Sequence, residues 1–385
     1  MPSYNPYLLI SADYPPHFIG GSRVWMYNLI ENCPENFDIL TVSLPEGETE
    51  ACSPRHRIFR KKWVINSLDP TRFQLLRNYI MIPLWLIFRF RKTRYRAVMI
   101  NTGAFGIGLF CMIGKLFGIP IIGVANGEEI TLAQHAKGFG GWIKRLMLYK
   151  GYPLAKGFVG VSQFCTRLLV GLGVNENTIV VIPSCVNPKK KSKLSKKTTP
   201  GFNVLSVGRL VERKGFHSLI EGAQLLRNDI PGLKVTIVGS GPMEPKLDSL
   251  IEKYQLQNHV EVKTDVSDEE LSKLYVNSDV FVLAHMVLPN GDTEGCPTVF
   301  SEAAGVGLPI IGGTGAGADT AINEGVNGYI VNSRDIRELS ERIKFLLLNP
   351  DVANKMGEAG IKKVAADHDP VINGRRLGEF LGRYK

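Results

Sequence analysis

The feature that most constrains the fold is an alternation of short apolar strands with amphipathic helices, which runs through the chain twice. In the first series the predicted strands cover residues 7–11, 38–42, 97–101, 119–125, 157–161 and 179–183. In the second series they cover residues 203–207, 234–238, 260–263, 280–283, 308–312 and 328–331, and helices are expected over 216–226, 245–254, 268–277 and 336–347. This rhythm is typical of parallel sheets covered by helices. The sequence therefore predicts an α/β fold with two doubly wound, Rossmann-like domains.

The composition changes where the two series meet. Residues 186–201 hold six lysines and no acid, and they show no apolar periodicity. This composition favours a solvated linker over a dedicated anion-binding patch. A chain of 385 residues is long enough for two domains with separate cores. We therefore predict a first domain over residues 1–185, a linker over 186–201 and a second domain over 202–369.

Positive charge is concentrated in the first half and in the linker. The formal net charge is +10, yet residues 201–385 carry more acids than bases. Residues 54–96 contain twelve Lys and Arg and a single acid, Asp69. A basic region of this density indicates nucleic acid, an anionic membrane or a phosphorylated ligand as the partner.

Several other classes of protein are disfavoured by simple patterns. The six cysteines are scattered, without C-x-x-C pairs, so neither a zinc site nor a disulfide framework is indicated and a reducing compartment is expected. The apolar stretches 79–88 and 98–125 are short or interrupted, whereas a membrane span needs about 20 predominantly apolar residues. The first residues lack the basic and apolar regions of a secretory signal.

The first loop of the second domain carries groups that suit a phosphorylated ligand. The strand 203–207 runs into Gly208 and Arg209, and Lys214 follows five residues later. This places two cations at the carboxyl edge of a sheet, where α/β folds bind ligands. A guanidinium offers a planar fork of donors and an ammonium offers a compact charge. An ordinary basic surface loop is the alternative.

The loop after the next strand contains the glycine pair Gly239 and Gly241. It lacks the third glycine of the dinucleotide fingerprint and has Pro242 in its place. A tight turn or close ligand approach is therefore favoured over a nicotinamide site.

The most informative segment is D-T-E-G-C-P-T-V-F-S-E at 292–302. Proline near its middle suits the first turn of a helix. Free backbone N–H groups of the segment 295–299 would then face an anion. Gly295, Cys296, Thr298 and Val299 supply them, and Pro297, which has no N–H, belongs to the same predicted donor site. Glu294 precedes the turn and Glu302 lies inside the helix, so the two acids can reach two parts of one ligand. The alternative is a pair of solvent-facing helix acids.

The two segments G-R-L-V-E-R-K-G-F at 208–216 and E-G-C-P-T-V-F-S-E at 294–302 resemble those of the retaining family 4 glycosyltransferases with the GT-B fold. The second segment matches their E-x(7)-E motif. The resemblance extends to their glycine-rich loop, to their H-G-x-E segment (here 126–129) and to the runs 308–313 and 324–328. It implies that the first domain handles the acceptor and that residues 370–385 cross back to that domain.

The resemblance implies a role for each matching residue of the second domain. Arg209 and Lys214 would hold the donor diphosphate and stabilise the charge on the leaving nucleotide. Glu302 would accept hydrogen bonds from the ribose and Glu294 from the transferred sugar. Backbone around Val266 would hold the base.

The resemblance also implies roles in the first domain. Gly20 and Gly21 would let the backbone approach the donor phosphate or the acceptor. Asn126 stands where many relatives have a histidine that contacts the donor sugar, and it cannot act as a general base because an amide does not titrate near neutral pH. His17 and His135 are the nearest replacements in the sequence, although an ordinary surface or packing role is favoured for both.

The basic segment 61–96 interleaves cations with aromatic and apolar side chains. This mixture fits a helix lying on an anionic bilayer. A packed core with a solvated basic face is the alternative. No nucleic-acid-binding module is recognised, so nucleic acid is not expected as a partner.

The sequence thus predicts a cytoplasmic enzyme, peripheral on the inner face of a membrane. We expect a retaining hexosyltransferase that moves sugar from a nucleotide-diphosphate sugar to a lipid-linked or membrane-associated glycan, in cell-envelope polysaccharide or glycolipid biosynthesis. No D-x-D motif lies near an apolar strand, so transfer without a metal or other cofactor is expected. A nucleotide-sugar epimerase and a catalytically weak membrane-bound assembly partner stay open as alternatives.

Overall fold

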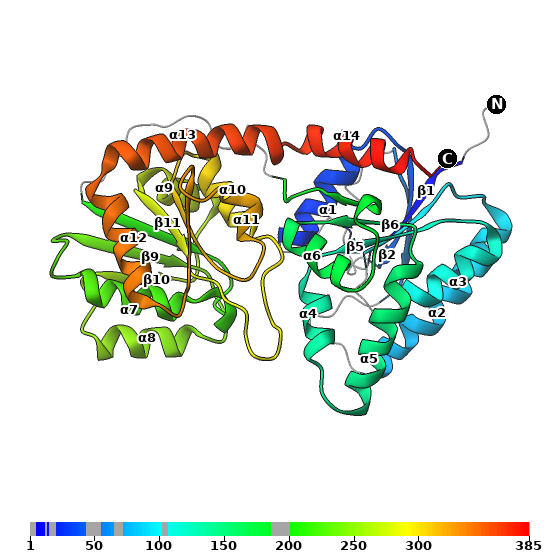
Figure 1. Ribbon diagram of the computed structural model, residues 1–385, viewed down its shortest axis with the longest axis horizontal. Coiled ribbons are helices and arrows are strands. Elements are labelled where there is room, and N and C mark those ends of the chain that lie inside the picture. The colour runs from blue at the N-terminus through cyan, green and yellow to red at the C-terminus, as the bar shows by residue number, and fades with distance from the viewer. Residues whose placement is uncertain are drawn as a thin grey trace. The chain divides into compact units, whose positions relative to one another are not determined.

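The computed structural model describes residues 5–11, 14, 21–43, 55–64, 72–101, 107–185 and 201–384, and at 21–23 and 72–79 it describes the backbone alone. The chain forms two compact units, one made of residues 1–185 with 370–385 and the other of residues 186–369 (Figure 1). The expected linker, 186–201, lies outside the described residues except for Gly201.

A seven-stranded parallel sheet forms the centre of the first unit, in the order β3-β2-β1-β4-β5-β6-β7. Its strands are β1 (Tyr7–Ser11), β2 (Phe37–Val42), β3 (Arg57–Lys61), β4 (Val98–Asn101), β5 (Ile121–Ala125), β6 (Gly157–Gly160) and β7 (Ile179–Val181). The order reverses between β1 and β4, whose last residues Ser11 and Asn101 lie opposite each other. This reversal is the topological switch point, where open α/β sheets bind ligands.

Helices cover both faces of this sheet: α1 (Gly21–Asn32), α2 (Arg72–Lys92), α3 (Ile107–Phe117), α4 (Glu128–His135), α5 (Gly138–Gly151), α6 (Gln163–Gly171) and α14 (Pro370–Leu381), with short turns η2 (Tyr152–Leu154) and η3 (Glu176–Thr178). The last helix, α14, belongs to this unit because it packs against α1. The Tyr7 hydroxyl donates to the Leu381 carbonyl at 3.0 Å, and a Cβ at Gly374 would come within 2.3 Å of the Asn32 backbone.

The second unit has a six-stranded parallel sheet in the order β10-β9-β8-β11-β12-β13. Its strands are β8 (Phe202–Val207), β9 (Leu233–Val238), β10 (Val260–Lys263), β11 (Val280–Leu283), β12 (Ile310–Gly313) and β13 (Gly328–Val331). Its helices are α7 (Phe216–Leu226), α8 (Glu244–Lys253), α9 (Asp268–Asn277), α10 (Thr298–Gly305), α11 (Ala318–Ala321), α12 (Ile336–Leu348) and α13 (Pro350–Asp367), with the turn η5 (Glu212–Lys214). Here the switch point lies between β8 and β11.

The prediction of two doubly wound parallel domains is confirmed, and each predicted strand and helix ends within two residues of its observed bounds. One strand, β3, was not predicted. Its sequence R-I-F-R-K is basic and every residue is at least partly exposed, because β3 is an edge strand paired only with β2. Basic side chains on an edge strand oppose pairing with another chain, but they hide the apolar alternation that reveals a strand. Among the described residues, no helix is both long and apolar enough to cross a membrane.

Candidate functional site

The switch point of the second sheet gathers the charged residues that the motifs single out. Arg209 and Lys214 follow β8, and Glu294 lies in the loop after β11, the neighbouring strand. Because the strands are parallel, these loops emerge at the same edge. The segments 208–216 and 294–302 therefore belong to one site.

Arg209 is exposed, and no hydrogen bond or ion pair engages its side chain within the described ranges. The loop that carries Arg209 packs against the glycine pair after β9, Gly239 and Gly241. A Cβ at Gly239 would lie 2.0 Å from the Gly208 carbonyl oxygen, and one at Gly241 would lie 2.5 Å from the Leu210 carbonyl oxygen. These glycines let two loops pack backbone to backbone, which leaves the Arg209 guanidinium available to a ligand.

Lys214 is buried and makes an ion pair with Glu294, with 3.0 Å between Nζ and Oε2. The lysine ends the turn η5, and the chain leaves that turn through Gly215 at φ +70°. A Cβ at Gly215 would also lie 1.8 Å from the Ala284 carbonyl oxygen. Glycine is therefore required to bring the lysine against the end of β11.

A second cation, Arg213, holds the other oxygen of Glu294. Its Nε donates to Glu294 Oε1 at 2.7 Å, and its Nη1 donates to Asp292 Oδ1 at 2.9 Å and Oδ2 at 3.2 Å. Arg213 and Asp292 were missed in the sequence analysis. The signal available was only their place within the segments 208–216 and 292–302, since their pairing depends on the meeting of loops 81 residues apart.

These contacts fix the charge state of Glu294. Burial alone would raise its pKa, but Lys214 and Arg213 outweigh burial and lower the pKa to about 2. Glu294 is therefore a carboxylate at neutral pH, and it can only accept hydrogen bonds. Hydroxyl groups of a sugar are suitable donors to it.

His285 lies beneath this cluster and was also missed. It is fully buried two residues after the end of β11, its ring contacts Phe300 at a centroid distance of 5.6 Å, and Gly313 N–H donates to its Nδ1 at 3.3 Å. Burial lowers the pKa of His285 to about 4, so the ring is neutral at physiological pH. This neutral ring joins the ends of β11 and β12 without adding charge under Lys214 and Glu294.

The helix predicted near Pro297 is α10, with Pro297 at its N-cap and Thr298 as its first residue. The first amides of a helix have no carbonyl partner inside it, so those of Thr298 and Val299 suit an anion. Gly317 N–H donates to the Glu294 carbonyl at 3.2 Å, which ties the loop before α10 to the segment before α11. Gly295 and Cys296 in that loop are half-buried.

Glu302 and Val266 lie on different elements of the same unit. The hydroxyl of Tyr275, from α9, donates to Glu302 Oε2 at 3.0 Å. Tyr275 is fully buried and its ring stacks on Phe281, so Glu302 is held by a rigid partner. Val266 is half-buried between β10 and α9, where it packs against the hydrophobic core.

A row of uncharged polar side chains marks the switch point of the first sheet. Asn126 follows β5, and its Nδ2 donates to Asn101 Oδ1 at 3.3 Å. Asn101 Nδ2 in turn donates to Ser11 Oγ at 3.3 Å. The row joins the ends of three neighbouring strands. Ser11 and Asn101 were not predicted, because strand register alone brings them beside Asn126.

The backbone of Asn126 is held by Glu129, whose Oε1 accepts from the Asn126 N–H at 2.9 Å across Gly127 at φ +98°. Burial raises the pKa of Glu129 to about 7. His135 contacts the Thr131 carbonyl on its own helix through Nδ1 at 2.8 Å, in agreement with a packing role. Gly21 begins α1, whereas His17 and Gly20 lie outside the described residues.

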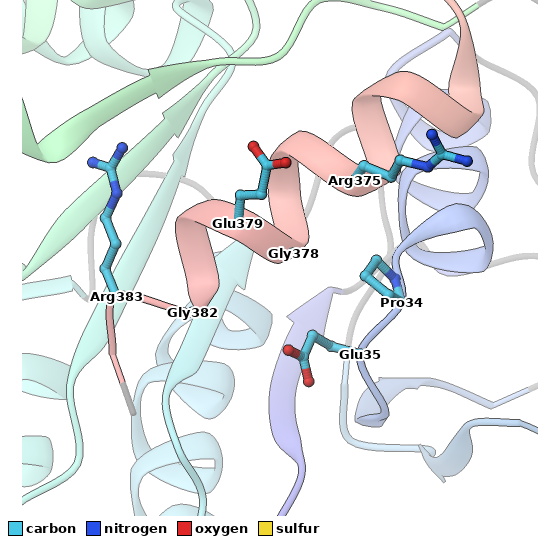
Figure 2. Close-up of a pocket in the computed structure, with 7 residues that line it drawn as sticks. All are labelled: Pro34, Glu35, Arg375, Gly378, Glu379, Gly382 and Arg383. Atoms are coloured by element: carbon cyan, nitrogen blue, oxygen red, sulfur yellow. The ribbon is translucent and has the colours of Figure 1, made fainter.

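A surface pocket of the first unit contains none of these residues. Figure 2 shows that it is formed by the turn after α1 and by α14, and it is lined by Pro34, Glu35, Arg375, Gly378, Glu379, Gly382 and Arg383.

Comparisons with known proteins agree with this architecture. Residues 187–363 match the family model of glycosyl transferases group 1, and residues 19–190 match that of glycosyltransferase family 4. The amylovoran biosynthesis glycosyltransferase AmsK of Erwinia amylovora is 27% identical over 58% of this chain and 55% of its own. The GDP-mannose-dependent alpha-(1-6)-phosphatidylinositol monomannoside mannosyltransferase of Mycobacterium tuberculosis is 30% identical over 50% of this chain and 49% of its own. The chain thus spans about half the length of the curated relatives it matches.

The fold itself is similar over nearly the whole length. A sucrose-phosphate synthase from Thermosynechococcus elongatus superposes with a TM-score of 0.78 over 98% of each chain, at 18% sequence identity. The two family models together span residues 19–363, from the first helix to the helix α13. The chain therefore belongs to the family 4 glycosyltransferases with the GT-B fold.

Proposed function

We propose that this protein is a retaining glycosyltransferase that moves a sugar from a nucleotide-diphosphate sugar to a lipid-linked or membrane-associated glycan. The observation that carries the proposal is the cluster at the second switch point, where Lys214 and Glu294 meet beside the free guanidinium of Arg209. One cluster thus offers cations for a diphosphate and a carboxylate for sugar hydroxyls.

The donor would bind with its diphosphate between Arg209, Lys214 and the first turn of α10. Lys214 can bind the diphosphate and Glu294 at the same time, because an ammonium has three N–H donors and Glu294 occupies one of them. As the bond between the sugar and the phosphate breaks, negative charge develops on the leaving nucleotide. The two cations would stabilise that charge, the kind of electrostatic effect that contributes most to many enzymes.

Glu294 would accept hydrogen bonds from the transferred sugar and Glu302 from the ribose. Both are held by other side chains, Glu294 by the partly buried Arg213 and Glu302 by the fully buried Tyr275. Binding of the donor would therefore need little ordering of these side chains, which lowers its entropic cost. Val266 would line the part of the site that holds the nucleotide base.

Retention would follow from transfer on a single face of the sugar. The bond from the anomeric carbon to the phosphate breaks, the bond to the acceptor oxygen forms on the same side, and the leaving phosphate takes the acceptor proton. Asn126 supports this route, since an amide at that position can orient a substrate hydroxyl but cannot remove its proton. Arg209 and Lys214 supply the positive charge in this scheme, and we propose that no divalent ion is needed.

The acceptor would meet the neutral row Ser11, Asn101 and Asn126 of the first unit. Amide and hydroxyl groups pair well with sugar hydroxyls and do not attract phosphate as cations do. The relatives named for amylovoran biosynthesis and for phosphatidylinositol monomannoside support a glycan or lipid-linked acceptor. We place the reaction on the cytoplasmic face of a membrane.

A thermal-shift screen with UDP-, GDP-, ADP- and TDP-sugars tests the proposal. One donor class should raise the melting temperature of the wild type, and Arg209→Ala should abolish that rise. The matched donor should then label a lipid-linked acceptor, with the donor's anomeric configuration retained in the product by NMR. EDTA should leave the rate unchanged.

Three outcomes would overturn parts of the proposal. Turnover of the donor without any acceptor would indicate an epimerase. Failure of every nucleotide sugar to bind would indicate an assembly partner without donor chemistry. Reversible loss of activity in EDTA would show that a metal ion is required.

A further inference from the structure

Three neighbouring helices of the first unit expose an unusual share of large apolar side chains. Among the described residues, 21 large apolar side chains are exposed, and twelve of them belong to α2, α3 and α5. Helix α3 packs against both of the others (Figure 1). Scattered single apolar residues are normal on a surface, whereas a concentration of this kind marks an interaction site.

Helix α5 turns its apolar face outward, the reverse of an ordinary surface helix. It buries two glycines and one leucine, Gly141, Leu148 and Gly151. Its exposed side chains recur at intervals of three and four residues, and they are Phe139, Trp142, Ile143, Leu146, Met147 and Tyr149. Phe139 and Trp142 are 77% and 53% exposed, and their rings stack on each other at a centroid distance of 5.9 Å.

Helix α3 adds a second apolar stripe beside α5. Leu109, Met112 and Leu116 are 41%, 66% and 79% exposed. The two helices meet backbone to backbone, because a Cβ at Gly108 would lie 2.9 Å from the Cα of Gly151. We call the exposed apolar side chains of these two helices the α3–α5 face.

The three helices α2, α3 and α5 carry charge of one sign. The sequences of α2, α3 and α5 contain no acidic residue, and they contain nine basic ones. On α3 and α5 the exposed lysines are Lys115, Lys144 and Lys150. Lys150 lies among the exposed apolar residues of α5, and Lys144 lies beside them. A helix that joins an exposed apolar face to basic residues is typical of the surface of an anionic bilayer.

The basic segment 61–96 contributes less than its composition indicates. Arg89 points inward, where it donates to Asp38 Oδ2 at 2.9 Å, and Arg96 pairs with Glu35 at 2.8 Å. Ile80, Leu84 and Phe88 do form an exposed stripe on α2, with Lys92 over the Phe88 ring. The larger apolar surface, however, lies downstream, on α3 and α5.

We propose that the α3–α5 face docks the protein on an anionic lipid bilayer. Phe139 and Trp142 would enter the headgroup region, where aromatic rings are favoured, and the lysines would lie against lipid phosphates. The absence of acids argues for a uniformly anionic partner rather than for a protein surface of mixed charge. This inference adds a docking surface to the proposed function and does not depend on catalysis.

Flotation of the full chain with vesicles tests the inference. The wild type should float with phosphatidylcholine vesicles that contain 30% phosphatidylglycerol, and much less with pure phosphatidylcholine. The double variant Phe139→Ser/Trp142→Ser should lose at least tenfold in binding. Lys144→Glu/Lys150→Glu should lose binding to the anionic vesicles by a similar factor. The matched control is Leu225→Ser/Leu348→Ser, which removes two similarly exposed leucines from the second unit and should bind like the wild type.

Three results would overturn the inference. The first is equal flotation of the wild type with neutral and anionic vesicles, or none with either. The second is undiminished flotation of the aromatic double variant. The third is a wild-type dimer in sedimentation velocity that the aromatic double variant dissociates, since a second copy would then cover the face. The thermal shift caused by nucleotide sugars is read on the same variants and should stay unchanged, so a failure of docking is distinguished from a failure of donor binding.

Discussion

Arg213 Nε donates to Glu294 Oε1 at 2.7 Å, while the same guanidinium is anchored by Asp292 through Nη1. Arg213 thus orients Glu294 from the side opposite to Lys214. Its removal takes the Arg213 contacts from both Asp292 and Glu294 and leaves Glu294 with its ion pair to Lys214. We expect Arg213→Ala to lower the free energy of unfolding by about 1–3 kcal/mol, because partly buried charges lose their partner. We expect kcat/KM to fall by about 10–100-fold, as is usual when a supporting partner is lost.

If Arg213 only stabilised the fold, its removal would leave the pH profile of kcat/KM unchanged. Without Arg213, the pKa of Glu294 should rise from about 2, so the acid limb of kcat/KM should move to higher pH. Arg213→Lys keeps a cation near Glu294, so its acid limb of kcat/KM should move less than that of Arg213→Ala. Lys344→Ala is the control, since its ion pair with Asp229 is exposed and should contribute little. A profile that does not move in Arg213→Ala would contradict the positioning role.

Arg209 and Lys214 differ in what they do before a ligand arrives. Arg209 is exposed and its side chain has no partner within the described ranges, whereas Lys214 is buried against Glu294. Both substitutions to alanine should weaken binding of the matching nucleoside diphosphate at least tenfold, or about 1.4 kcal/mol, by calorimetry. Only Lys214→Ala should also lower the melting temperature without ligand. Equal melting temperatures for the two variants would refute this division of roles.

The strands were predictable because each is a short apolar run bounded by turn residues, as in V-F-V-L at 280–283. The edge strand β3 was not, because an edge strand can carry charge on both faces. Lys214 and Glu294 were found because both belong to local motifs. Arg213, Asp292, Ser11 and Asn101 depend on which loops and strand ends meet, and no local pattern encodes that meeting.

The exposed apolar α3–α5 face could not be predicted from the sequence either. The sequence of α5 is amphipathic in the ordinary sense, and its period does not tell which face is buried. The answer comes from packing, since only glycine at Gly108 and Gly151 allows α3 and α5 to meet at the backbone. That close approach turns the larger side chains outward. Composition therefore placed the membrane contact on residues 61–96, whereas tertiary packing favours α3 and α5.

Tyr275 holds Glu302 through its hydroxyl at 3.0 Å. Tyr275→Phe keeps the stacked ring and removes the hydroxyl that makes this bond, so the free energy of unfolding should fall by about 0.5–1.5 kcal/mol. Glu302 would lose this anchor, and KM for the donor should rise several-fold with little change in kcat. Tyr7→Phe is the matched control, because its buried hydroxyl donates to the Leu381 carbonyl within the first unit, whereas Glu302 belongs to the second. Tyr7→Phe should lower the free energy of unfolding and leave KM for the donor unchanged. A similar rise in KM in both variants would show that the effect is not specific to Glu302.

Glu129 should make the stability of the first unit depend on pH. Burial raises its pKa from 4.5 to about 7, so the folded chain holds the proton more tightly than the unfolded chain does. Stability is therefore fully present below pH 4.5 and is lost as pH rises through 7, by on the order of 3 kcal/mol for this group. Glu129→Gln keeps an oxygen that can accept from the Asn126 N–H but removes the titration. Between pH 5 and 8, the wild type should lose stability relative to Glu129→Gln in urea unfolding, while exposed Glu176→Gln should follow the wild type. Parallel curves for the wild type and Glu129→Gln would show that Glu129 titrates normally in the folded protein.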